Sequence, residues 1–138
     1  MRRLRYLLPL ALVVGACMSE LDLYEAQGPR YEARAWLAVN PNPSPFASNR
    51  FESKGAAAAF IDSLYALGAD TVYVLNVEQD SAWVQEEGGP YADALLIRLP
   101  AEQAARERLF VVNAREARLE GFDPEPDRAQ QYLYFWWD

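Results

Sequence analysis

The stretch SKGAAAAFIDSLYALGADTVYVLNV, residues 53–77, predicts a helix followed directly by a buried strand. Ser53 is a common N-cap residue, and Gly68 stands where a C-terminal cap belongs. Between them, apolar residues recur at the three- and four-residue spacing of one helix face: Ala57, Phe60, Ile61, Leu64 and Leu67. Residues 71–77 are apolar on both faces. We therefore expect a helix over residues 53–67 and a strand over residues 71–77.

The flanking segments extend this pattern to four strands and two helices. Apolar and polar residues alternate over 31–39, which predicts a strand, and a proline-rich loop follows. Two further strands are expected at 93–99 and 131–137, and Pro100 is placed for the first turn of a long helix over 101–119. The order βαββαβ is that of the ferredoxin-like α+β fold. That fold has a four-stranded antiparallel sheet in the order 4-1-3-2, with two helices on one face.

In this topology, the loops at 40–52, 78–92 and 119–130 emerge at the same end of the sheet. They are rich in carboxylates, and six of these are candidate binding residues: Glu78, Asp80, Glu86, Glu87, Asp123 and Asp127. Long loops on a rigid scaffold are a common location for binding sites, and clustered carboxylates favour cations or basic partners. The alternative interpretation is a solvated acidic surface without a ligand.

The sheet face away from the helices is a second candidate site. Alternation along the predicted strands places four aromatic residues there: Trp36, Tyr132, Tyr134 and Trp136. Such a face would stack a sugar or a peptide, or it would pack against a second copy of the chain in a homodimer.

The first 17 residues predict export. Three arginines precede a short apolar run over residues 6–14, and small residues follow, as in a secretory signal peptide. The apolar run is much shorter than the roughly 20 residues that a membrane-spanning helix needs. The motif Val14-Gly-Ala-Cys17 resembles the lipobox of bacterial lipoproteins.

This resemblance implies cleavage after residue 16 and a lipid anchor on Cys17. Residues 17–30 would then be the lipidated cysteine and a flexible tether, and residues 31–138 a single α+β domain. Met18 follows the cysteine instead of an acidic residue, which by the same resemblance favours the outer membrane of the cell envelope over the inner one.

Composition excludes several classes of chemistry. The chain has no histidine and one cysteine, so Ser-His-Asp and Cys-His catalysis and zinc sites built from these residues are excluded. No glycine-rich phosphate-binding motif is present, and we expect no cofactor and no metal. Removal of residues 1–16 would leave 10 basic residues against 20 acidic ones, a net charge of −10. Such a charge disfavours nucleic acid as a partner.

These observations favour a non-enzymatic binding module of the cell envelope, with an envelope protein or the cell wall as partner. One alternative is a small hydrolase that pairs Glu78 or Asp80 with Glu86, Glu87 or Asp93. Another is an inhibitor or immunity-type protein that blocks a basic toxin or enzyme with its acidic loops. The segments around Tyr91 and Trp136 also resemble a family of small uncharacterised bacterial proteins, which implies no activity.

Overall fold

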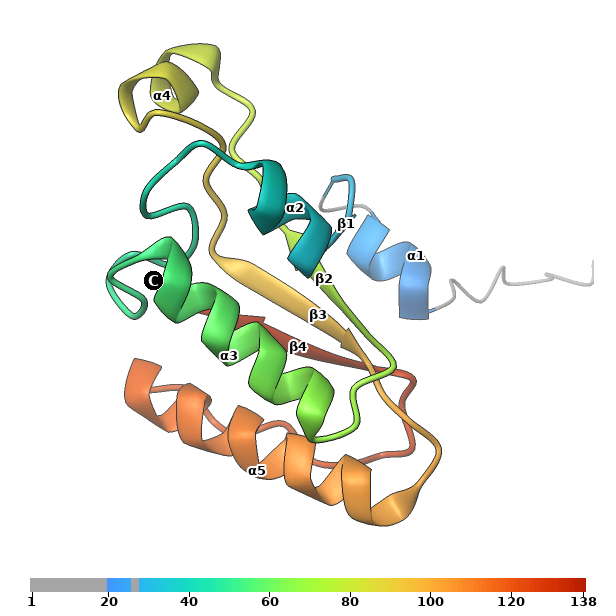
Figure 1. Cartoon of the computed structure of the whole chain (residues 1–138). Coiled ribbons are helices and arrows are strands. Elements are labelled where there is room, and N and C mark those ends of the chain that lie inside the picture. The colour runs from blue at the N-terminus through green and yellow to red at the C-terminus, as the bar shows by residue number, and fades with distance from the viewer. Residues whose placement is uncertain (1–19, 26–27) are drawn as a thin grey trace, which may run out of the picture.

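The computed structural model describes residues 20–25 and 28–138, which form an α+β fold (Figure 1). The predicted signal peptide, residues 1–16, and Cys17 lie outside these residues. None of the helices in the described ranges is long and apolar enough to cross a membrane. The elements, in chain order, are α1 (Glu20–Glu25), β1 (Tyr31–Glu32), α2 (Ala33–Val39), α3 (Lys54–Ala66), β2 (Thr71–Leu75), α4 (Ser81–Glu86), β3 (Ala94–Arg98), α5 (Gln103–Glu120) and β4 (Tyr132–Trp136).

The four strands form one antiparallel sheet, so the α+β class and the antiparallel sheet are confirmed. Its order is β1-β2-β3-β4, which corrects the predicted ferredoxin-like order 4-1-3-2. The cause lies in the segment predicted as the first strand, residues 31–39. The carboxylate of Glu32 accepts hydrogen bonds from the backbone N–H groups of Arg34 and Ala35, so the chain turns into α2 after two strand residues. A two-residue strand cannot pair along both edges as a central strand must. β1 therefore lies at the edge of the sheet beside β2, and β4 pairs with β3 instead of with β1.

The other predicted elements form close to their expected positions. The Ser53 side chain accepts a hydrogen bond from the N–H of Ala56 and caps α3, which ends before Gly68 at a φ of 112°. The long helix α5 begins at Gln103, two residues later than predicted. The Glu102 carboxylate caps it by accepting from two backbone N–H groups.

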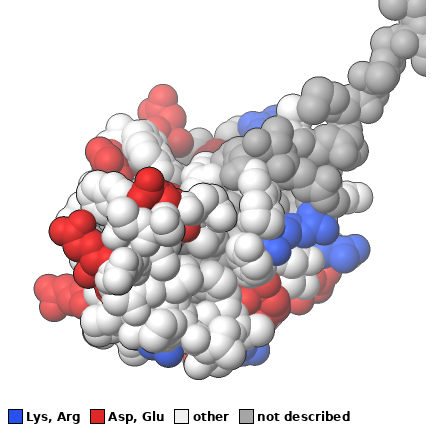
Figure 2. All heavy atoms as spheres, turned by 90° about the horizontal axis from the view of Figure 1, so that it is seen from above, with Lys and Arg blue, Asp and Glu red and all other residues white. Residues whose placement is uncertain are grey.

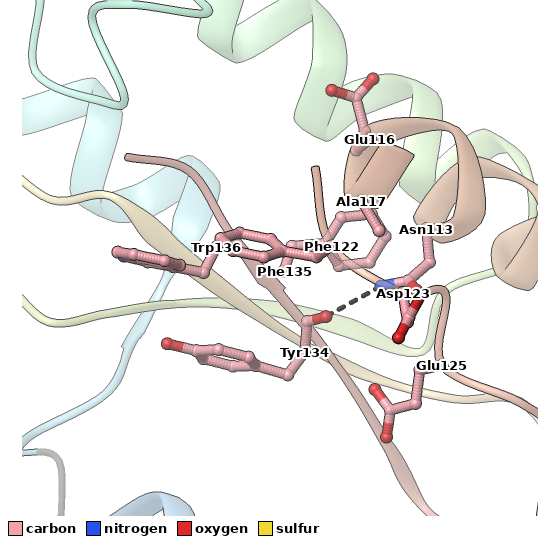
Figure 3. Close-up of a pocket in the computed structure, with 9 residues that line it drawn as sticks. All are labelled: Asn113, Glu116, Ala117, Phe122, Asp123, Glu125, Tyr134, Phe135 and Trp136. Carbon is pink, nitrogen blue, oxygen red and sulfur yellow. Dashed lines mark hydrogen bonds between the residues drawn. The ribbon is translucent and has the colours of Figure 1, made fainter. Parts of the chain in front are cut away.

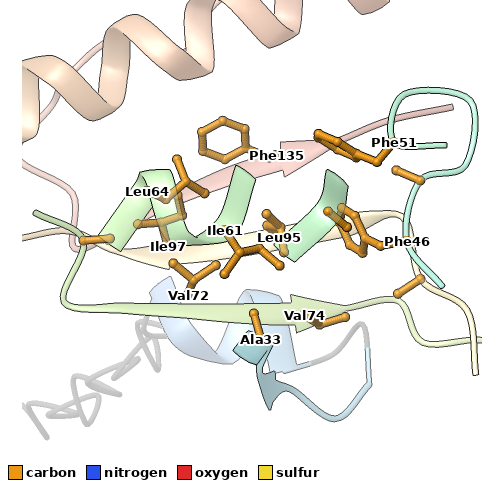
Figure 4. Close-up of a cluster of buried hydrophobic side chains, with 14 of the residues drawn as sticks. Ala33, Phe46, Phe51, Ile61, Leu64, Val72, Val74, Leu95, Ile97 and Phe135 are labelled. Atoms are coloured by element: carbon orange, nitrogen blue, oxygen red, sulfur yellow. The ribbon is translucent and has the colours of Figure 1, made fainter. Parts of the chain in front are cut away.

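One face of the sheet carries the main hydrophobic core, which α2, α3 and α5 cover. Figure 4 shows Ile61 and Leu64 of α3 clustered with Val72 and Leu95 of the sheet. Trp36, predicted to lie on the opposite face, belongs to this core, because α2 turns its indole inward and leaves it 8% exposed. Of the four aromatic residues predicted for the opposite face, Trp36 was therefore assigned to the wrong face.

The opposite face carries a smaller apolar cluster that includes Leu96 and Tyr132. Helix α1, which lies within the predicted tether, packs there, and its Tyr24 ring stacks on Tyr134 with centroids 5.8 Å apart. The Glu20 carboxylate accepts hydrogen bonds from the N–H groups of Gln131 and Tyr132. Part of the predicted flexible tether is thus a helix on the sheet.

Two of the three predicted long loops meet at one end of the sheet. The segments around residues 40–52 and 78–92 are joined by a bridge between Phe46 and Ala92. The third loop departs from this arrangement. It begins near Trp136, where Phe122 stacks, and runs to the other end of the sheet, because β4 starts there. The reversed direction of β4 relative to the prediction explains the difference.

Candidate functional site

Helix α4 projects from the end of the sheet between β2 and β3 (Figure 1). It has no buried residue, so it adds nothing to the hydrophobic core. Its shape is held by caps instead. The Asp80 carboxylate accepts from the N–H groups of Ala82 and Trp83, and the N–H of Gly89 donates to the carbonyl of Val84. A six-residue helix is not stable in isolation, so its neighbours must maintain it.

Two buried asparagines attach this projection to the domain. The Asn40 side chain donates to the carbonyl of Pro90, and the Asn42 side chain donates to the carbonyl of Gly89. Both asparagines are at most 4% exposed. The backbone passes so close that a Cβ on Gly89 would lie 2.8 Å from Asn40 Oδ1, so this position requires glycine. The buried side chains of Asn40 and Asn42 and the close packing at Gly89 therefore hold α4 in place, although α4 has no residue in the hydrophobic core.

The projection presents a pocket of about 320 Å³, which we call the α4 site. It is lined by Ser48, Glu78, Trp83, Val84, Glu87 and Tyr91. The indole of Trp83 is 60% exposed, although a ring of this size is usually well covered. The wall opposite is fixed, because the Tyr91 hydroxyl accepts a hydrogen bond from the N–H of Ser48 at 3.1 Å. The N–H of Glu78 donates to the carbonyl of Tyr91, which joins the two arms of the loop.

The charge at this site is negative. Glu78, Asp80, Glu86 and Glu87 lie on or beside α4, and no ion pair involves them among the residues that the structure describes. Figure 2, which looks down on this end, shows acidic side chains on the near face and basic ones toward its margins. An exposed indole beside unpaired carboxylates attracts a cation by charge and by its π face. The site therefore suits an alkylammonium or guanidinium group.

The six acidic candidates separate into three places. Glu78, Asp80, Glu86 and Glu87 gather around α4 as described. Asp123 lines a different pocket beside the end of α5. Asp127 lies at the other end of the sheet, where its carboxylate accepts from the Arg106 guanidinium at 2.7 Å. These hydrogen bonds hold the pKa of Asp127 below its usual value.

The pocket that contains Asp123 runs along β4 and encloses about 360 Å³ (Figure 3). Phe122 stacks on Trp136 with centroids 5.2 Å apart, and the Asn113 side chain donates to the backbone carbonyl of Tyr134. This amide thus satisfies one backbone carbonyl of β4, the last strand of the sheet.

The structure brings three of the aromatic candidates together on β4: Tyr132, Tyr134 and Trp136. Tyr132 is buried, Tyr134 is half-buried, and Trp136 is 38% exposed. The ring of Tyr24 in α1 packs on Tyr132 and Tyr134, so these two residues contact α1 and do not form an open aromatic surface.

Asp93, the remaining member of the predicted carboxylate pairs, is partly buried near the C-terminal end of β4. Burial raises its pKa, although the Trp136 indole donates to Oδ2 at 3.3 Å. Its Oδ1 is buried without a hydrogen bond. Asp93 lines neither the α4 site nor the pocket along β4. Desolvation of one carboxyl is one requirement of a carboxylate hydrolase, but a cavity that would bring substrate to it is needed as well.

Sequence reasoning missed three residues that line the α4 site: Ser48, Trp83 and Tyr91. A tryptophan within an acidic, glycine-rich loop was the available signal, because such a ring has no core to enter. In the described ranges, no group of three or more histidine, cysteine or acidic residues is arranged to hold a metal ion. No family model, no curated protein and no solved structure matches this chain.

Proposed function

We propose that this protein is a non-enzymatic binding module of the bacterial cell envelope, and that its α4 site holds a basic group of a partner protein or of the cell wall. The observation that carries this proposal is the exposed Trp83 beside Glu78 and Glu87, on a helix that has no buried residue. A helix such as α4, which is kept in place but adds nothing to the hydrophobic core, is expected where the surface has a binding role.

The membrane anchor is the second part of the proposal. A lipidated Cys17 would stand three residues before Glu20, which contacts the N-terminal end of β4. The α4 site lies at the opposite end of the sheet, beyond the C-terminal end of β2. An anchor at Cys17 would therefore leave the α4 site directed away from the membrane, where a partner can reach it. Met18, and not an acidic residue, follows Cys17, and by the resemblance to bacterial lipoproteins this favours the outer membrane.

Anchoring is tested by labelling cells with a radioactive fatty acid. The protein should take up label and fractionate with membranes, and the Cys17→Ser variant should take up none. Label in that variant, or an unmodified protein that is wholly soluble, would contradict the anchor.

Binding is tested by calorimetry with a short oligolysine peptide as the basic probe. Trp83→Ala should weaken binding by about fivefold, because a cation–π contact contributes on the order of 1 kcal/mol. Glu78→Gln with Glu87→Gln should weaken it further and reduce its dependence on salt. The matched control is Glu52→Gln with Asp70→Asn, which removes the same charge outside the site. Equal loss in the control and in the site variant would reject the α4 site.

A further inference from the structure

The outward face of α5 is basic and apolar. Residues at the three- and four-residue spacing of one helix face form what we call the α5 stripe: Arg108, Val111, Arg115, Arg118 and Leu119. Val111 is 69% exposed and Leu119 is 64% exposed. The same helix buries Leu109 and Val112 in the core, so the stripe is the face that no part of the described chain covers.

The stripe and the α4 site carry opposite charges. Three of the 13 basic residues of this acidic chain lie on the stripe, with Glu107 at its margin. Arg108 approaches Glu102 only to 3.9 Å, and Arg115 pairs with Glu116 while its side chain stays 59% exposed. Helix α4 and the outward face of α5 lie on different sides of the molecule (Figure 1), so one copy cannot bring its own two surfaces together.

We propose that the α4 site of one copy binds the α5 stripe of a second copy. The guanidinium of Arg115 or Arg118 would enter between Trp83 and the carboxylates of Glu78 and Glu87. The exposed side chain next to that arginine, Val111 or Leu119, would gain apolar cover from the Trp83 ring. This contact joins unlike surfaces, so each copy keeps one unused α4 site or stripe for the next copy.

This inference rests on the proposed function, because it names the basic partner of the α4 site. The net charge is −7 for the full chain and would be −10 without residues 1–16, which opposes association at long range. At physiological salt, charges are screened beyond about 8 Å, and close complementary pairs remain. Anchoring in one membrane would raise the effective concentration of the copies.

The test uses photo-crosslinking of the full chain in an uncharged detergent, with benzoylphenylalanine in place of Trp83. We expect crosslinked dimers whose second attachment site maps to α5, and a yield that falls as salt rises. Arg115→Glu with Arg118→Glu should lower the yield by more than about tenfold, because like charges then face each other. Glu86→Arg with Glu87→Arg should do the same. An equal mixture of the two charge-reversed variants should restore crosslinking, because each then supplies the surface that the other repels.

The matched control is Arg98→Glu with Arg128→Glu, which changes the net charge equally outside the stripe and should leave the yield unchanged. Failure of the mixture to restore crosslinking, or crosslinks that map outside α5, would overturn the inference. So would Arg115-dependent binding to anionic vesicles by a chain that stays monomeric, because the stripe would then face lipid. The proposed function stands or falls separately, since oligolysine binding should survive Arg115→Glu with Arg118→Glu.

Discussion

Arg50 and Glu116 form a two-point ion pair between the loop before α3 and helix α5. Arg50 Nε donates to Oε2 of Glu116 at 2.9 Å, and Nη2 donates to Oε1 at 3.0 Å. The Trp137 indole also donates to this carboxylate at 3.2 Å. Glu116 is 2% exposed, so its charge depends on these donors. The pair therefore ties the loop that carries Ser48 to the body of the domain.

Replacement of Arg50 by methionine should destabilise the protein by about 2–3 kcal/mol. The substitution keeps an unbranched apolar stem but leaves the buried Glu116 carboxylate without its main donor. The free energy of unfolding, measured by urea denaturation, checks this value. The matched control is Asp62→Asn, which breaks the exposed pair between Arg34 and Asp62 and should cost less than about 1 kcal/mol. Equal losses would show that the buried pair contributes no more than the surface pair.

The stability of the protein should depend on pH through Glu116 and Asp93 with opposite signs. Burial opposes ionisation of Glu116, but the hydrogen bonds from Arg50 and Trp137 outweigh it and hold its pKa below 4.5. Its contribution is therefore present above the unfolded-state pKa and is lost as pH falls through the folded-state value. Burial raises the pKa of Asp93 above 3.8, so its stabilising contribution is present at low pH and is lost as pH rises.

Urea denaturation across a pH series checks both signs. Glu116→Gln should be less stable than the unmodified protein at neutral pH, and the difference should shrink in acid. Asp93→Asn should be more stable at neutral pH, because it removes a charge from a buried site, and this advantage should also vanish in acid. A stabilising Glu116→Gln variant at neutral pH would contradict the assignment.

Two glycines should respond to alanine in opposite directions. Gly89→Ala should destabilise the protein by more than about 1 kcal/mol, because the new Cβ would meet Asn40 Oδ1 and the N–H of Asn42 at 2.8 Å. Gly55 lies in α3 with no atom closer than 3.8 Å to its Cβ position, so Gly55→Ala should stabilise by about 0.5–1 kcal/mol. Thermal denaturation separates the two. Gly89→Ala should also weaken oligolysine binding, whereas Gly55→Ala should leave it unchanged.

Local sequence signals explain which parts of the fold were predicted. Helix α3 has cap residues and apolar spacing within its own segment, and β2 is a continuous apolar run. Residues 53–77 could therefore be predicted from local sequence alone. Residues 31–39 were predicted wrongly because Ala33, Trp36 and Leu37 also fit the three- and four-residue spacing of a helix. The Glu32 cap decided between the two, and glutamate is not among the preferred N-cap residues.

The site depended on contacts distant in sequence. The carboxylates around α4 were predicted as a group, because they are close neighbours in the chain. Asp127 was wrongly grouped with them, since its position follows from the direction of β4 and from its pairing with Arg106. The loop that carries Trp83 is attached to the domain through Asn42, whose side chain donates to the carbonyl of Gly89, 47 residues away, and no local pattern reveals that contact.

Helix α1 contacts the sheet through the Tyr24 ring and the Glu20 carboxylate. A six-residue helix cannot persist alone, so α1 should form only while Tyr24 and Glu20 hold it. Burial, followed by the negative charge of Glu125, raises the pKa of Tyr24 to about 12. Neutral Tyr24 is thus favoured in the folded state, and its contribution is lost as pH rises from about 10 through about 12.

Glu20→Gln with Tyr24→Ala should release α1 and speed hydrogen exchange at two amides, those of Gln131 and Tyr132. Both donate to the Glu20 carboxylate, so they lose their acceptor when α1 leaves. The amide of Trp137 donates to the carbonyl of Asp93 at the far end of the sheet and serves as the internal reference, with unchanged exchange expected. Leu23→Ala, on the exposed side of the same helix, is the matched control and should leave all three amides unchanged. If the double variant also leaves Gln131 and Tyr132 protected, α1 does not shield this edge, and the segment before residue 28 acts as the free tether that the sequence predicted. If exchange rises at these two amides alone, the tether is shortened by docking, and a lipid on Cys17 would hold the domain within about 10 Å of its anchor, the reach of three extended residues.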